Sequence, residues 1–330
     1  MPTGTVNSTI ASYLGELFQS SKRPNTLLRM LGGLRGGVSE ATSKEFPIGV
    51  FWNLPAPSQP ANLEGANAPS PEYRALTQST NVIQIYQEAV QVTYLAQSDN
   101  TVSGVVPIPQ GAANGSVQNP RSVEFQVMTT LEKIAQDANY SFWNGVFANP
   151  ANPSVNPLKT RGIITAIVTN IQDQSATTAN TITPTIYRGY INSLMGKIIA
   201  SNGYNVDDTW TLTAGPTEFS NICAAFEAQG TIYLTPESVV FGVKVRKVLT
   251  RFGTINIVMD PDIPDQTVVI SNLGVVGIVG LPVPNKGILF EEALFKQGSA
   301  DQTQIYGQLG IDHGPEYAHG KLLLPAGVSL

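Results

Sequence analysis

An alternation of apolar and polar residues decides the interpretation of this chain: Ile83-Gln84-Ile85, then Val90-Gln91-Val92-Thr93-Tyr94. Successive side chains of a β-strand point to opposite faces of a sheet, so the pattern predicts a strand with one buried face. A second strand pattern, Phe46 to Trp52, precedes it, and the tip between them (residues 55–71) contains five prolines. Residues 46–95 are therefore predicted to form a long hairpin in which residues 83–94 are the returning strand.

Such a hairpin has no hydrophobic core of its own, and an isolated two-stranded hairpin is marginally stable in water. The regular alternation on the returning side favours a docked hairpin over a loose surface loop. We expect it to lie on other protein.

The first 45 residues predict an arm with the same need for a partner. The apolar residues of a first helix share one stripe: Ile10, Tyr13, Leu14, Leu17 and Phe18. A second short helix, Thr26 to Leu31, ends at Gly32-Gly33, and the glycine-rich run 31–37 indicates a hinge. Four basic residues, Lys22, Arg23, Arg29 and Arg35, make residues 22–35 the one locally basic stretch of the chain. Two small amphipathic helices cannot bury both apolar faces alone, so they need the rest of the chain or another subunit.

The longest helical pattern follows a connector rich in Gly, Pro and Asn. It covers about residues 121–145. Its apolar positions recur every three or four residues: Val127, Leu131, Ile134, Ala138 and Phe142. Residues 148–183 then show loop chemistry around one short predicted strand, Gly162 to Val168.

From Thr183 onwards the pattern predicts a compact α/β block. Thr183 caps a helix with Pro184 at its first position, and Pro216 begins another helix. Alternation over residues 239–246 predicts one half-exposed strand. The β-rich tail from Gly274 is expected to pair with earlier strands, which makes the fold class α+β.

The composition indicates a surface that meets other protein. Charged residues are 13% of the 330, while hydrophobic residues are 42%. A lone globule normally covers itself with charge for solubility, so a charge-poor polar surface favours protein contacts. The net charge of −5 argues against tight packing on nucleic acid, which requires many Lys and Arg residues.

Targeting and redox signals are sparse. We find no basic segment before an apolar stretch near Met1, hence no signal peptide, and no apolar run long enough for a bilayer. Cys223 is the single cysteine, so no intrachain disulfide forms, as expected for assembly in a reducing cytoplasm.

The residues that could carry chemistry favour structural roles. His313 and His319 are the only histidines, and their spacing suits no familiar zinc motif. Cys223 lies on the apolar side of its predicted helix, which predicts a buried, inert thiol. Residues 31–37 lack the strand and helix that a phosphate-binding loop requires.

The one candidate metal site is an acidic turn that contains Asp260, Asp262 and Asp265. A calcium-binding EF-hand loop needs further ligands and a closing Glu, which are missing, so we expect a turn without metal. A carboxylate pair for hydrolysis among the 24 acidic residues stays open, but nothing singles one out. We expect neither catalytic activity nor a cofactor.

Three stretches carry a resemblance to a known family: Arg23–Leu28 through Gly32-Gly33 to Phe46, Asn81–Thr93, and Gly307–Ile311 with Glu316–Gly320. The order of the predicted elements (arm, long hairpin, long helix, loop region, compact α/β block and β-rich tail) resembles that of the major capsid proteins of tailed phages with the HK-ninety-seven fold. The chain is most similar to the head-protein family labelled after phage SU-ten.

The resemblance implies a division of the chain into regions. These would be an N-arm (1–45), an E-loop hairpin (46–95), a P-domain with a spine helix (96–182), an A-domain (183–265), and an A-domain edge with returning P-domain strands (266–330). It also implies self-assembly into pentamers and hexamers of an icosahedral head around double-stranded DNA, in the virion. Expected partners are a portal and scaffold or decoration proteins; no membrane is involved.

Two departures from the family pattern refine this expectation. Some members cross-link an E-loop lysine to a neighbour, but no lysine lies between Lys44 and Lys133, so we predict non-covalent contacts. The arm is short, which predicts a separate scaffold protein or none. The residues predicted to contact other subunits are Lys22, Arg23, Arg29, Arg35, Arg74 and Glu88.

Rival functions stay open. The first is an encapsulin-like cellular compartment, which shares the fold but encloses cargo enzymes. The second is a soluble hydrolase, which would need an unrecognised carboxylate pair. The third is a tail or decoration protein, although such proteins rarely need a long spine-like helix.

Overall fold

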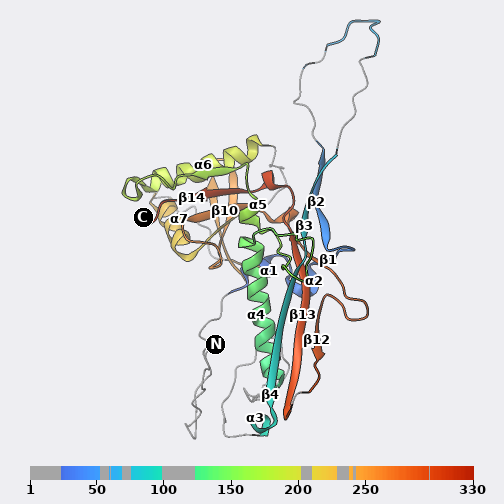
Figure 1. Cartoon of the computed structure of the whole chain (residues 1–330). Helices are drawn as coiled ribbons and strands as arrows, with labels where there is room; N and C mark the ends of the chain where they lie inside the picture. The colour runs from blue at the N-terminus through green and yellow to red at the C-terminus, as the bar shows by residue number, and fades with distance from the viewer. Residues whose placement is uncertain are drawn as a thin grey trace.

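The computed structural model describes residues 24–52, 59, 61–68, 76–98, 123–201, 210–228, 238–240, 243–296 and 298–330. The fold is α+β, as predicted: two sheets with their helices form the body, and a two-stranded hairpin projects from it (Figure 1). Among the described residues, no helix combines the length and hydrophobicity that crossing a bilayer requires.

The five-stranded sheet is built around the longest strand, β13 (Ala300–Asp312). One edge of β13 pairs with β4, and its other edge pairs first with β12 and then with β11. The remaining strands are β4 (Gln84–Thr93), β11 (Gly277–Gly280), β12 (Leu289–Ala293) and β1 (Val38–Glu40), which is parallel to β11.

The predicted long helix is present as α4 (Val123–Asn144), which runs alongside β4 and β13 (Figure 1). Its apolar stripe forms one core with the sheet, in which Ile134 and Phe142 pack with Ile305 and Leu309. The predicted helix of the arm, α1 (Thr26–Met30), buries Leu27 and Leu28 in the same core. The predicted glycine-rich hinge contains a short helical turn, α2 (Gly33–Gly36), and Gly32 and Gly33 at its start adopt positive φ angles that favour glycine.

The seven-stranded sheet has the order β5-β14-β10-β6-β9-β8-β7. Its strands are β5 (Ile171–Asp173), β6 (Trp210–Ala214), β7 (Ser238–Val240), β8 (Val243–Thr250), β9 (Gly253–Met259), β10 (Thr267–Asn272) and β14 (Gly320–Leu323). Helices α6 (Pro184–Ala200) and α7 (Pro216–Glu227) pack on it and begin at the predicted prolines. Thr183 caps α6 as predicted, since its hydroxyl oxygen accepts from the Ile186 N–H at 3.4 Å. The tail returns as predicted, because β13 and β14 pair with earlier strands.

The hairpin exists, but its returning strand was wrongly predicted. β2 (Glu45–Trp52) pairs antiparallel with β3 (Leu76–Val82), whereas the alternating residues 84–93 form β4 and pair with β13. Alternation reveals that one face is buried but does not identify the neighbouring strand. Here Tyr86 is buried in the core shared with α4, which anchors β4 to the body.

Two further strand predictions were wrong. Residues 162–168 contain a helical turn, α5 (Ile163–Ala166), because Ile163 and Ile167, four residues apart, both enter the core. Residues 239–240 belong to β7 and residues 243–246 to β8, and these two strands pair antiparallel. The alternation of apolar and polar residues continues from β7 into β8, so the sequence pattern does not reveal the reversal between them.

Short elements complete the fold: α3 (Tyr94–Ser98) and the 3-10 turns η1 (Ala179–Thr181), η2 (Leu273–Val275) and η3 (Glu316–Ala318). The first predicted helix of the arm and the connector before α4 lie outside the described residues.

Candidate functional site

The two histidines are buried structural groups. Asn272 N–H donates to Nδ1 of His319 at 3.3 Å, so the proton of this ring is on Nε2, which donates to the His313 carbonyl at 2.6 Å. Burial lowers the pKa of both side chains to about 4. Both imidazoles are therefore neutral at pH 7.

The acidic turn is a structural anchor for α4. Oδ2 of Asp260 accepts from Trp143 Nε1 at 2.8 Å and from Asn139 Nδ2 at 3.3 Å, and the same amide donates to Asp262. Burial raises the pKa of Asp260. Asp265 lies exposed outside this network, and the described residues contain no group of three metal-ligating side chains.

Cys223 is buried in α7, and Arg246 Nη1 lies 3.5 Å from its sulfur. Burial raises the pKa of the thiol, which keeps it protonated at neutral pH.

The charges predicted to contact other subunits are only partly described. Lys22, Arg23, Arg74 and the side chain of Arg35 lie outside the described residues, while Arg29 is exposed in the last turn of α1. Glu88 forms an ion pair with Lys133 of the same chain. Contacts between subunits through these residues stay a prediction.

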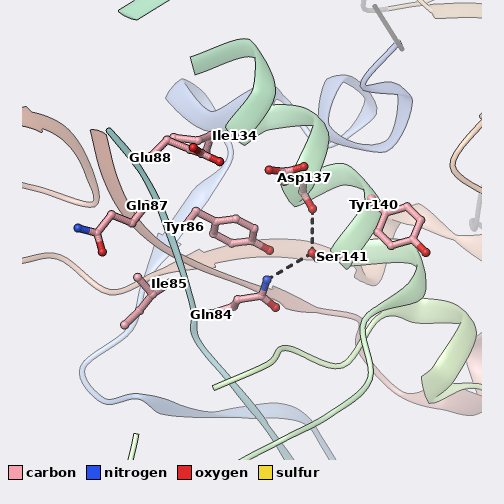
Figure 2. Close-up of a pocket in the computed structure, with 9 residues that line it drawn as sticks. All are labelled: Gln84, Ile85, Tyr86, Gln87, Glu88, Ile134, Asp137, Tyr140 and Ser141. Atoms are coloured by element: carbon pink, nitrogen blue, oxygen red, sulfur yellow. Dashed lines mark hydrogen bonds between the residues drawn. The ribbon is translucent and has the colours of Figure 1, made fainter. Parts of the chain in front are cut away.

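A groove of about 360 Å³ lies between β4 and α4 (Figure 2). It is lined by Gln84, Ile85, Tyr86, Gln87, Glu88, Ile134, Asp137, Tyr140 and Ser141. Five consecutive strand residues line it although their side chains alternate between two faces, so the groove follows the edge of β4. Among the described strands β4 pairs with β13 alone, which leaves that edge open to an added strand.

The groove is polar but offers no unpaired charge, because Lys133 Nζ bridges Glu88 and Asp137. The Tyr86 hydroxyl is buried and points toward Ser141 (Figure 2). Burial raises the pKa of this phenol, so it remains a proton donor.

A second surface lies at the end of the body remote from the hairpin, where α3 follows β4 (Figure 1). Phe295 is 96% exposed and Leu95 80% exposed. Nearby, Lys296 Nζ donates to the Tyr94 hydroxyl at 3.0 Å and pairs with Asp301 at 3.1 Å. Sequence analysis did not select these residues. The one sequence feature that could have indicated this surface is the apolar pair Leu294-Phe295, which directly follows β12.

These surfaces, a projecting hairpin and an open strand edge, suit an assembling subunit. A family model described as SU10 major capsid protein matches residues 1–327. The chain belongs to this family.

Solved structures show the same fold at low identity. The capsid of the native GTA particle has a TM-score of 0.59 at 11% identity, covering 98% of each chain. The capsid of Cyanophage P-SCSP1u has a TM-score of 0.58 at 10% identity, covering 96% of this chain and 93% of that one. The holo-SrpI encapsulin complex from Synechococcus elongatus PCC 7942 has a TM-score of 0.61 at 9% identity, covering 94% and 91%. No curated protein matches the chain.

The SU10 family member described here is therefore a bacteriophage major capsid protein with the HK-ninety-seven fold, whose function is to form a shell. Its family is one of structural capsid proteins, which form the virion shell. The expected family, fold class and shell-forming function are confirmed.

Proposed function

We propose that this chain assembles into pentamers and hexamers of an icosahedral head that encloses double-stranded phage DNA, held by non-covalent contacts and without catalysis. The observation that carries the proposal is the β2–β3 hairpin, which projects from the body and exposes all of residues 61–68 (Figure 1). An unsupported hairpin of this kind is marginal in water, so a neighbouring copy is its natural support. Repeated head-to-tail contacts then close into rings and a shell.

The groove along β4 is our proposed receiving surface for a neighbouring copy. It lies along an open strand edge, and its two carboxylates, Glu88 and Asp137, share the ammonium of Lys133. The hairpin supplies backbone carbonyls and amide side chains such as those of Asn62 and Asn67. The regions proposed above, 1–45, 46–95, 96–182, 183–265 and 266–330, would act as N-arm, E-loop, P-domain, A-domain and A-domain edge with returning strands.

Non-covalent closure and the remaining partners complete the proposal. The absence of lysine between Lys44 and Lys133 removes the usual cross-linking group from the hairpin. Purified particles boiled in denaturant should run as one band near 35 kDa, and a ladder of multiples would refute the proposal. We further propose assembly in the host cytoplasm with a portal and with scaffold or decoration proteins, and DNA contacts that are not sequence-specific.

Imaging of expressed protein tests the assembly. The full chain should give hollow polyhedra in the void fraction of a sizing column, whereas a variant lacking residues 55–71 should remain small with unchanged circular dichroism. Shells from the deletion variant would contradict the role of the hairpin. Particles from infected cells distinguish the two shell functions, since packaged DNA supports a phage head and a cargo enzyme would support a compartment.

A further inference from the structure

Two chain crossings link the described sheets directly from strand to strand. The first runs from β10 through η2 to β11, and the second from β13 through η3 to β14. These two crossings are therefore the places where contacts can fix the angle between the sheets.

The crossings are fastened to each other by the histidine pair. Asn272, which ends β10, donates its N–H to Nδ1 of His319, which precedes β14. Nε2 of the same ring donates to the carbonyl of His313, which follows β13. One neutral imidazole thus connects the first crossing to both ends of the second.

Close packing reinforces this junction. A Cβ added to Gly314 would lie 2.8 Å from the Val275 carbonyl oxygen, so the crossings touch through backbone. Gly49, at the bulge of β2, packs on Gly314 and Pro315 in the same way. The base of the hairpin therefore rests on the fastened crossings.

We infer that His313 and His319 form an acid-sensitive latch that holds the two sheets, and with them the hairpin base, in one relative orientation. A second proton on His319 would bring an imidazole N–H against the Asn272 N–H and remove the bond between the crossings. Nδ1 of His313 lies 2.8 Å from the Gly314 carbonyl and donates to it, while Nε2 is buried without a partner among the described residues. A proton there would create a buried charge with no acceptor.

The charged neighbours set the direction of the response. Arg161 and His319 face His313 and disfavour its protonation, while Glu316 faces His319 and favours it. Asp312 accepts from the Gly314 N–H in the same turn, and burial raises the pKa of this carboxyl. Burial is the largest cause at both imidazoles and lowers each pKa to about 4. Since an unfolded histidine titrates near 6.5, the latch is complete at pH 7 and weakens as the pH falls.

Two measurements on the full chain test the latch. Deuterium exchange at the imidazole C2 positions, followed by mass spectrometry, reports each pKa, and no other histidine interferes. Both should titrate below pH 5; a value near 6.5 for either overturns the inference. Amide exchange, corrected for intrinsic rates, should show residues 272–276 and 313–319 opening together between pH 7 and 5, ahead of β6 and β9. Unchanged protection in both crossings, or simultaneous opening of the whole fold, would also overturn it.

A non-titrating pair of side chains provides the control. His313→Asn keeps a donor for the Gly314 carbonyl, and His319→Asn keeps an acceptor for Asn272. The folded-to-unfolded ratio of the natural chain should fall about 20-fold per histidine between pH 7 and pH 5. The double variant should lose that part of the pH response, and an equal slope in both proteins would refute the latch. If the double variant fails to fold, the C2 exchange of the natural chain still decides.

Discussion

Replacing Asn139 with alanine tests the anchor between α4 and the seven-stranded sheet. The side chain is fully buried. It accepts from the Leu28 N–H at 3.2 Å and donates to Asp260 at 3.3 Å and to Asp262 at 2.5 Å. Two of these bonds meet buried carboxyl groups, and a hydrogen bond to a charged group contributes about 1.5–3 kcal/mol. The bond from the Leu28 N–H and the cavity left by the side chain add to this cost, but the contributions are not fully additive. We therefore expect the free energy of unfolding to fall by about 3–5 kcal/mol.

Denaturant unfolding of the unassembled subunit at pH 7 measures this loss. Trp143→Phe keeps an aromatic side chain but removes the indole N–H donor to Asp260 and leaves a small cavity, so it should cost at least about 1.5–3 kcal/mol. Thr129→Ala is the matched control, because it removes an exposed hydroxyl from the same helix and should change stability by less than about 0.5 kcal/mol. The deficit of Asn139→Ala should shrink at lower pH, since a protonated Asp260 needs fewer donors. A loss below about 1 kcal/mol at pH 7 would refute the anchor.

Three further predictions follow from particular contacts. Thr183→Ala should destabilise the subunit by about 1 kcal/mol in thermal unfolding, since the cap of α6 is lost; no change in Tm would show that the cap is dispensable. The free energy of unfolding of the natural chain should fall by about 2 kcal/mol per histidine between pH 7 and pH 5, because the depressed pKa values near 4 make the unfolded state bind protons first; a flat profile contradicts this. Phe295→Ser should leave unfolding unchanged, because the ring is exposed, while lowering the yield of shells in light scattering; equal assembly would exclude this surface.

Local rules were sufficient where the signal is local. Thr183-Pro184 and Pro216 marked the starts of α6 and α7 because capping and the fixed φ of proline act within one turn. The recurrence of Val127, Ile134 and Phe142 located α4, since one face of a helix must be apolar to bury. The projecting hairpin was visible in outline because its tip is rich in proline and contains no large apolar residue except Leu63.

The tertiary structure decided everything that depends on which segments meet. Alternation located β4, but only the fold paired it with β13 more than 200 residues away, since backbone hydrogen bonds carry no sequence information. The same limit hid the reversal between β7 and β8. The acidic turn, the histidine pair and the Tyr86 groove acquire their roles from burial. Burial depends on packing from every direction, and the sequence alone determines only which residues are able to tolerate it.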